Sequence, residues 1–260
     1  MNISPTPHPD VNEILNLLFT DAKEILQNHF IGMYLFGSLA NGDFDEHSDI
    51  DVLVVTDTDI SSDLFETLKE MHERITEIDS PWAIQLEVSY IPQSALRHFD
   101  RSNILHPHMD RGNGEVLNMM AHESDWVIQR YILRERGITI IGDDLKTLID
   151  PVPPGDLQWA VSDILHNWIK HILDSPQELG SRGYKSYTVL TLCRMLYTYK
   201  HGDIVSKPVA AEWAKENLDK HWTPLIERAL VGRQNPSLDA EPEDINGTVD
   251  LIRFTMEHIK

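Results

Sequence analysis

The sequence is short of cysteine, of positive charge and of long apolar runs. Its single cysteine, Cys193, allows no internal disulfide, and the cysteine content gives no indication of an oxidising compartment. Residues 1–10 carry neither a basic start nor an apolar run, so we expect no secretory signal. No apolar stretch reaches the length that is needed to cross a bilayer. These absences predict a cytoplasmic protein with no membrane partner.

The scarcity of positive charge limits the partners. The chain has 22 lysines and arginines against 42 aspartates and glutamates, a net charge of -20. An acidic surface repels phosphate backbones and releases no counterions from them, so we expect no nucleic-acid partner. The same field attracts cations, which favours a positively charged small molecule or a basic protein surface. The alternative, that the acidity only keeps the protein in solution, stays open.

The first part of the chain mixes helical and strand patterns. Apolar residues at helical spacing predict helices over residues 11–30, 61–78 and 122–136. Short apolar or β-branched runs predict strands at 31–36, 50–55, 85–91 and 138–141. Residues 92–118 have little periodicity and are interpreted as a long loop. The pattern predicts a mixed α+β domain with a small sheet.

Proline and glycine at 150–155 place a domain boundary there, so we expect domains over residues 1–150 and 151–260. Beyond the boundary the pattern is helical. We expect helices over 157–172 with Asp156 as N-cap, over 187–200 ending at Gly202, after Ser206 as N-cap, and over 248–258. Trp168 and Trp213 lie at helical spacing and are interpreted as packing residues. The second domain is predicted to be a helical bundle.

Three carboxylates form a candidate metal site. Asp49 and Asp51 are separated by one residue at a predicted strand, so their carboxylates project from the same face. Mg²⁺ prefers oxygen ligands and keeps several waters, so two carboxylates with substrate phosphate oxygens satisfy it. Glu87 lies mid-strand between apolar neighbours, where an ionised carboxylate is costly unless a cation pairs with it. If the two strands are neighbours, Glu87 completes the Mg²⁺ site.

A candidate phosphate site precedes these carboxylates. Gly37 lets the backbone approach a phosphate closely, and Ser38 offers a hydroxyl and a backbone N–H at the expected start of a short helix. Ser48, beside the first aspartate, offers a second hydroxyl. Each feature alone is common in turns. Together with the three carboxylates, they predict a magnesium-dependent nucleotidyltransferase.

The expected loop and its border hold four histidines: His98, His106, His108 and His122. Their spacing matches no tight zinc-ligand pattern and no cysteine accompanies them, so we interpret them as scattered loop residues. One or two of them, with Asp110 or Glu123, are candidates for lining an acceptor pocket.

The segments Leu35-Phe36-Gly37-Ser38 and Ser48-Asp49-Ile50-Asp51-Val52-Leu53 resemble the DNA polymerase β-like nucleotidyltransferase superfamily. Further segments narrow the resemblance: Leu86-Glu87-Val88, Val189-Leu190-Thr191-Leu192-Cys193-Arg194, Ser206-Lys207 and Val209-Ala210-Ala211-Glu212-Trp213-Ala214. With them, the chain resembles the aminoglycoside adenylyltransferases that modify streptomycin and spectinomycin. The resemblance covers nearly the whole chain and is weakest over residues 92–185.

The resemblance implies an N-terminal nucleotidyltransferase fold and a helical domain that completes the ATP and acceptor site. It implies transfer of AMP from ATP, the co-substrate, to a hydroxyl of an aminoglycoside-like small molecule, with release of pyrophosphate. In that family the two aspartates, here Asp49 and Asp51, hold Mg²⁺, and the third carboxylate, here Glu87, is the base on the acceptor hydroxyl. An arginine and a lysine of the helical domain, matching Arg194 and Lys207, hold the triphosphate.

The chain departs from this family at two acceptor contacts. The drug-binding members carry a tryptophan in the loop after the third carboxylate, where this chain has His106-Pro107-His108-Met109-Asp110. They also carry an acidic residue followed by Glu-Arg-Asn before the arginine helix, where this chain has Gly183-Tyr184-Lys185-Ser186. The acceptor and the oligomeric state therefore stay open. Two alternatives remain, an adenylyltransferase that modifies a protein and a nucleotide-binding regulator without turnover.

Overall fold

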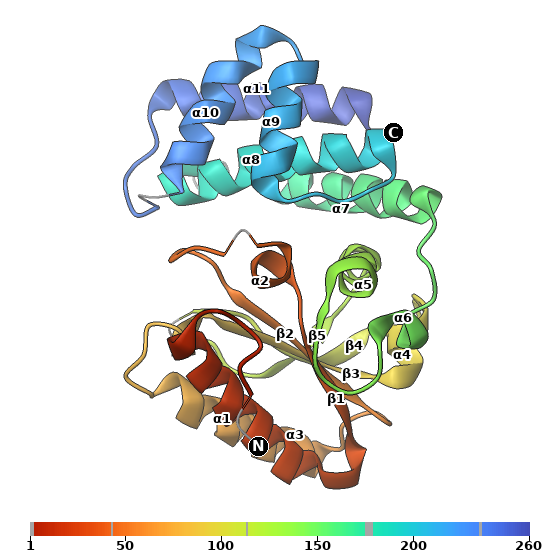
Figure 1. The fold of residues 1–260 in the computed structure, drawn as a ribbon. Helices are drawn as coiled ribbons and strands as arrows, with labels where there is room; N and C mark the ends of the chain where they lie inside the picture. The colour runs from red at the N-terminus through yellow and green to blue at the C-terminus, as the bar shows by residue number, and fades with distance from the viewer. Residues whose placement is uncertain (1–2, 43, 113, 175–178, 234–235) are drawn as a thin grey trace. The chain divides into compact units, whose positions relative to one another are not determined.

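The structure, a computed structural model, describes residues 3–42, 44–112, 114–174, 179–233 and 236–260. The chain forms two compact units, Met1–Pro151 and Val152–Lys260 (Figure 1). Within the described ranges, no helix combines the length and the apolar character that a membrane span requires.

The first unit is built on one six-stranded mixed sheet. Its helices are α1 (Pro9–Leu26), α2 (Gly37–Asn41), α3 (Ser62–Thr76), α4 (Gln93–Arg97), α5 (Asp125–Arg136) and α6 (Leu145–Leu148). Its strands are β1 (Phe30–Leu35), β2 (Ile50–Thr56), β3 (Leu86–Pro92), β4 (Leu105–Met109), β5 (Asn118–Ala121) and β6 (Ile138–Ile141). The strand order is β5-β4-β3-β2-β1-β6, in which β2 and β3 are parallel and the other neighbouring pairs are antiparallel. The predicted mixed α+β class is confirmed.

Helices cover both faces of this sheet, which explains the continuous β-branched run of β2. Val52 and Val54 belong to the core under α1 and α3, two helices that lie together on one side of the sheet (Figure 1). Leu53 and Val55 belong to the core that contains residues of α4, α5 and α6. Because strand side chains alternate, Asp51 projects to the same side as Leu53 and Val55.

The interpretation of residues 92–118 as a long loop is wrong. This segment contains α4 and β4, and β5 begins at its end. Residues 106–109 of β4 are all buried, and two of them are His106 and His108, which are 1% and 5% exposed, so the strand lacks the apolar pattern that would reveal it. Pro107 in its middle also argued against a strand, because proline is usually confined to edge strands and bulges.

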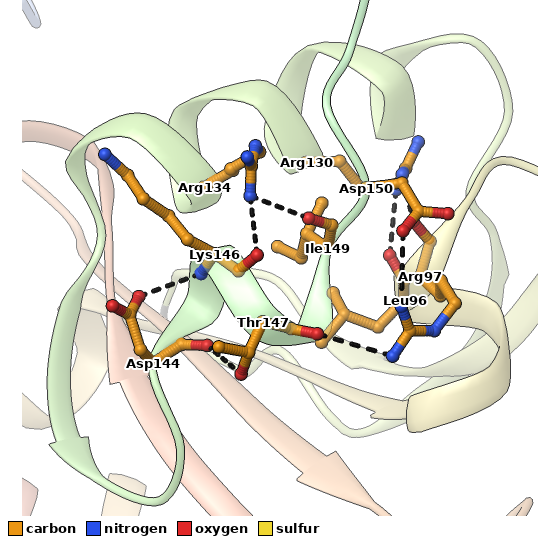
Figure 2. A network of polar contacts seen from close by, with 9 residues as sticks. All are labelled: Leu96, Arg97, Arg130, Arg134, Asp144, Lys146, Thr147, Ile149 and Asp150. Atoms are coloured by element: carbon orange, nitrogen blue, oxygen red, sulfur yellow. Dashed lines mark hydrogen bonds and ion pairs between the residues drawn. The ribbon is translucent and has the colours of Figure 1, made fainter.

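Two arginines of α5 form hydrogen bonds with the C-terminal ends of α4 and α6 (Figure 2). Arg130, 4% exposed, donates from Nε to the carbonyl oxygen of Leu96 (2.9 Å) and from Nη2 to that of Arg97. Arg134 donates from Nη1 to the carbonyl oxygens of Lys146 (2.8 Å) and Ile149 (2.9 Å). The last carbonyls of a helix lack partners inside the helix. The guanidinium groups supply donors to them at the ends of α4 and α6.

The second unit is helical, as predicted. Its helices are α7 (Pro154–Asp174), α8 (Arg182–His201), α9 (Lys207–Asn217), α10 (Thr223–Gly232) and α11 (Pro242–His258). The helix α8 packs against each of the other four. From α8, the buried Lys185 donates from Nζ to Asp244 of α11 (2.8 Å), which also accepts from Arg228 of α10 (2.6 Å).

Several helix boundaries differ from those expected. Ser206 is the N-cap of α9 and Gly202, with φ +63°, ends α8, and both predictions are confirmed. Asp156 is not an N-cap, because α7 already begins at Pro154 and Asp156 lies in its first turn. The helix α8 begins earlier than expected, after Ser181, whose hydroxyl accepts a hydrogen bond from the backbone N–H of Tyr184 (3.1 Å). The helix α11 also starts earlier than expected, and α10 was not predicted.

Candidate active site

The parallel pairing of β2 with β3 brings the three predicted carboxylates together. Asp51 and Glu87 are direct partners in the register of these strands, and Asp49 immediately precedes β2. Each of the three residues is half-buried and offers a carboxylate oxygen within 4.8 Å of the others. Among the described residues, this is the only group of three or more histidines, cysteines or acids that approach so closely. The geometry is suited to a cation.

The pKa of Glu87 is strongly raised in this cluster. Burial and the nearby charges of Asp51, Asp49 and Asp110 raise the pKa of Glu87 to about 9, while Arg111 opposes the shift. Closely spaced carboxylates repel one another, so the fully ionised cluster requires a bound cation. Its donors are all hard oxygens, the ligand type that Mg²⁺ prefers and that soft-metal sites avoid. The residues present therefore fit Mg²⁺.

The turn between β1 and α2 is shaped around Asp51. Gly37 has φ +62°, and a Cβ on it would lie 1.8 Å from Oδ2 of Asp51. The backbone N–H of Phe36 donates to the carbonyl oxygen of Asp51 (3.2 Å), which fixes the turn to β2. The hydroxyl of Ser38 is buried and makes no hydrogen bond within the described structure. The glycine is thus required by the carboxylate, and the serine hydroxyl has a hydrogen-bonding capacity that the described residues leave unused.

The hydroxyl of Ser48, expected at the phosphate, is engaged elsewhere in this structure. It donates to Oδ1 of Asp45 (2.9 Å) and accepts from the backbone N–H of Asp45 (3.0 Å). Because a hydroxyl has a single hydrogen to donate, a phosphate contact from Ser48 would require the bond to Asp45 to break. The observed role of Ser48 is to shape the turn before Asp49.

Arg111 is a site residue that the sequence did not indicate. Its Nε lies 3.7 Å from Oδ2 of Asp49, and its Nη1 donates to the carbonyl oxygen of His47 (3.2 Å). Its neighbour Asp110, already a candidate for the acceptor pocket, acts on the pKa of Glu87. Both positions follow β4. No signal in the sequence could locate them while that strand was interpreted as a loop.

Three of the four histidines form a buried cluster and are not scattered. The rings of His106 and His108, both on β4, lie 5.9 Å and 5.5 Å from that of His122, centroid to centroid. Nδ1 of His108 is hydrogen-bonded to the hydroxyl of Ser89 on β3 (2.9 Å). Burial lowers the pKa of all three imidazoles, that of His122 to about 3, so they are neutral at physiological pH. His98, in contrast, is the exposed C-cap of α4.

The two cationic residues that the resemblance implies lie in the helical unit. Arg194 is half-buried on α8. Lys207 is the first residue of α9, and its Nζ lies 4.3 Å from the ring centroid of Tyr187 on α8. The rings of Trp168 and Trp213 contact other aromatic rings, those of Tyr187 and Tyr197.

Comparison with known proteins identifies both parts of the chain. The profile of the nucleotidyltransferase domain matches residues 19–106, and that of the aminoglycoside adenylyltransferase C-terminal domain matches residues 147–256. A spectinomycin 9-adenylyltransferase of Staphylococcus aureus is 30% identical over 220 residues, covering 81% of this chain and 80% of that protein. An aminoglycoside (3'') (9) adenylyltransferase of Escherichia coli is 26% identical, covering 88% of each chain.

A solved structure has the same fold. The spectinomycin adenyltransferase AAD(9) of Enterococcus faecalis, determined with ATP and spectinomycin, superimposes with a TM-score of 0.71 at 21% identity, over 95% of this chain and 98% of that one. The site, the two domain profiles and the Staphylococcus aureus relative lead to one conclusion. The chain is a nucleotidyltransferase and belongs to the aminoglycoside adenylyltransferase family.

Proposed function

We propose that this protein transfers AMP from ATP to a hydroxyl of an aminoglycoside-like small molecule and releases pyrophosphate, with Mg²⁺ held by Asp49, Asp51 and Glu87. The observation that carries this proposal is the carboxylate cluster on β2 and β3, in which Glu87 has a pKa of about 9. Without a cation, so high a pKa keeps Glu87 protonated at neutral pH, and the positive charge of bound Mg²⁺ would ionise it so that it can accept a proton. An ionised carboxylate beside a cation is an arrangement that supports transfer to a hydroxyl.

In the proposed reaction one bond forms, one bond breaks and one proton is transferred. The acceptor oxygen forms a bond to the α-phosphorus while the bond between the α-phosphorus and the pyrophosphate oxygen breaks, and pyrophosphate leaves with that electron pair. Glu87, in its ionised form, accepts the hydroxyl proton. Mg²⁺, when bound, supplies positive charge that offsets the charge developing on the α-phosphate and the leaving group.

The remaining residues are proposed to bind the nucleotide. The buried hydroxyl of Ser38, which has no hydrogen-bond partner in the described structure, would donate to a phosphate oxygen beside Gly37. Ser48 supports the preceding turn and would reach a phosphate only after releasing Asp45. Arg194 and Lys207 would hold the triphosphate, so that the helical unit completes the ATP and acceptor site.

For the acceptor, we propose a cationic aminocyclitol or aminoglycoside. The net charge of -20 attracts such a molecule, and the relatives are named for spectinomycin and for aminoglycosides. Asp110, whose charge acts on Glu87, is positioned to attract an ammonium group next to the base.

The proposal is tested by incubating the purified protein with ATP, Mg²⁺ and a panel of aminocyclitols and aminoglycosides. Pyrophosphate release and the mass of each panel member are measured. We expect an adenylylated product from at least one panel member, and no product when Mg²⁺ is removed with a chelator. Pyrophosphate release that depends on a protein acceptor instead, with every panel member unchanged, would refute the small-molecule assignment.

A further inference from the structure

Arg111 places a positive charge beside the carboxylate cluster. Its Nε lies 3.7 Å from Oδ2 of Asp49, and its Nη1 donates to the carbonyl oxygen of His47 (3.2 Å). Burial and the neighbouring acids raise the pKa of Glu87, and the charge of Arg111 opposes that rise. A guanidinium group stays charged throughout the physiological pH range. Arg111 therefore acts on two of the three carboxylates that are proposed to hold Mg²⁺.

The backbone at Arg111 is held in place, whereas its side chain has room to move. The backbone N–H of Arg111 donates to Oδ1 of Asp110 (2.9 Å), and that of Gly112 donates to the carbonyl oxygen of Ile84 (2.9 Å), just before β3. The side chain is 42% exposed, and its ion pair with Asp49 is longer than a hydrogen bond. Exposed ion pairs of this kind are weak. The guanidinium can therefore exchange Asp49 for another anion while the backbone stays where it is.

A fixed positive charge has opposite effects on a free metal ion and on a nucleotide. The guanidinium of Arg111 repels a divalent cation, so it weakens the binding of free Mg²⁺ to the carboxylates. ATP brings several negative charges together with the metal, and the planar guanidinium is well suited to phosphate oxygens. Mg²⁺ keeps its ligands about 2.1 Å from the ion. Phosphate oxygens on an ion held by Asp49 therefore come near a guanidinium that already contacts Asp49.

We propose that Arg111 makes the site selective for the Mg²⁺–ATP complex over free Mg²⁺. In the absence of nucleotide the guanidinium pairs with Asp49, and when ATP arrives with the metal it turns to a phosphate oxygen. This inference rests on the proposed function, in which Asp49, Asp51 and Glu87 hold Mg²⁺. The alternative is that Arg111 only clamps the turn at residues 47–49, and the two accounts predict different results.

The test measures two affinities of Arg111→Met at pH 8, without any acceptor. Binding of Mn²⁺ alone, which prefers the same oxygen ligands as Mg²⁺, is followed by electron paramagnetic resonance. Binding of ATP in excess Mg²⁺ is followed by calorimetry. The variant should bind Mn²⁺ about three- to tenfold more tightly than the wild type, because a repelling charge is gone. It should bind ATP about tenfold more weakly, because one charge-assisted hydrogen bond is lost.

The sign of the Mn²⁺ effect separates the two accounts. Removal of the guanidinium also favours the proton on Glu87, which the metal must displace. That proton carries one charge and Mn²⁺ carries two, so the gain in metal affinity should exceed this loss. A clamp on the turn predicts the opposite sign, because a loosened turn would displace Asp49 and weaken its hold on the metal.

Two further variants serve as controls. Arg111→Lys keeps the charge, so it should bind Mn²⁺ as the wild type does and lose less affinity for ATP than Arg111→Met. Arg74→Met removes the same charge from an exposed arginine of α3, which lies 3.8 Å from Asp21, and should leave both affinities unchanged. Circular dichroism confirms that each variant is folded.

Three results would overturn the inference. They are unchanged or weaker binding of Mn²⁺ to Arg111→Met, unchanged binding of ATP to that variant, and equal effects in Arg74→Met. In each case metal binding, ATP binding and AMP transfer by the wild type would leave the proposed function standing. A wild type that binds no Mn²⁺ with or without ATP would overturn this inference together with the metal site of the proposed function.

Discussion

Gly37 is the residue on which the place of Asp51 most directly depends. Its φ is +62°, and a Cβ at this position would lie 1.8 Å from Oδ2 of Asp51, which leaves no room for a side chain. We predict that Gly37→Ala displaces this carboxylate and lowers kcat/KM at least about a hundredfold, since a displacement of one ångström at a reacting group has that effect. Steady-state kinetics measure the loss.

Gly42 is the matched control for this prediction. It also has a positive φ, +77°, but among the described residues no atom beyond its chain neighbours lies within 4 Å of the position of a Cβ. Gly42→Ala should show a similar backbone strain of about 1–2 kcal/mol, seen as a lower melting temperature, and nearly normal activity. Equal losses of activity in the two variants would mean that strain, and not the collision with Asp51, accounts for the effect.

The pKa of Glu87 predicts how the metal-free protein responds to pH. The folded state raises this pKa from 4.5 to about 9, so it holds the proton more tightly than the unfolded state does. Stability without metal should therefore fall as the pH rises from 4.5 towards 9. Glutamine resembles the protonated acid and does not titrate. Metal-free Glu87→Gln should thus melt above the wild type at pH 8, as followed by thermal denaturation.

Added Mg²⁺ supplies the complementary half of this experiment. It should raise the melting temperature of the wild type at pH 8 and have much less effect on Glu87→Gln, which lacks one of the three ionised ligands. Identical dependence on pH and Mg²⁺ in the two proteins would contradict both the raised pKa and the metal assignment.

Among the elements, β4 carries two of the three histidines in the buried cluster, and the third, His122, follows β5. This cluster should affect the stability of the protein in acid. Burial and the neighbouring His108 and His106 lower the pKa of His122 from 6.5 to about 3. The folded state resists protonation of His122, so stability should be lost as the pH falls from 6.5 towards 3. His122→Phe removes this proton-binding group and should unfold at a lower pH than the wild type in an acid titration.

The exposed His98 provides the comparison for this titration. His98→Phe should leave the acid midpoint unchanged, because this side chain lies at the surface and outside the buried histidine cluster. If both substitutions shift the midpoint equally, the buried cluster is not the source of the acid sensitivity.

The arginine contacts of α5 predict a difference between a buried and an exposed guanidinium (Figure 2). Arg130→Met leaves the carbonyl of Leu96 without this donor, while that of Arg97 keeps the backbone N–H of Asp150 (2.9 Å), and should lower the free energy of unfolding by about 1–3 kcal/mol. Arg97→Met breaks an exposed ion pair with Asp150 (3.2 Å) and should lower it by less than about 1 kcal/mol. Urea denaturation compares the two, and equal losses would contradict the account.

The elements that the sequence predicted are those whose own apolar residues recur with the spacing of a helix or a strand. Strand β2 and helix α3 have such patterns, and they occur close to the expected positions. Strand β4 was missed because two of its four buried residues are histidines and its centre is Pro107. The helices α8 and α11 start earlier than expected because their first turns carry few apolar residues. The start of α8 is capped by Ser181, whereas that of α11 has no side-chain cap and carries Asp244, which pairs with Lys185.

At the scale of the whole molecule, the sequence predicted the fold class and the family, because the motifs on β2 and β3 and on α8 and α9 are local in the chain. The approach of Asp51 to Glu87 followed from the expectation that their strands are neighbours, which the register now specifies. Arg111 could not be predicted, since its place beside Asp49 depends on the missed strand β4. The acceptor could not be predicted, because the chain departs from the expected family pattern at residues 106–110 and 183–186.

The central claim is that Asp49, Asp51 and Glu87 form the Mg²⁺ site of AMP transfer. The most direct test compares the wild type with Asp51→Asn for adenylylation of an aminocyclitol acceptor, measured by mass spectrometry with ATP and Mg²⁺. We predict an adduct from the wild type and none from Asp51→Asn, with unchanged circular dichroism. An adduct formed by Asp51→Asn at the wild-type rate would contradict the account.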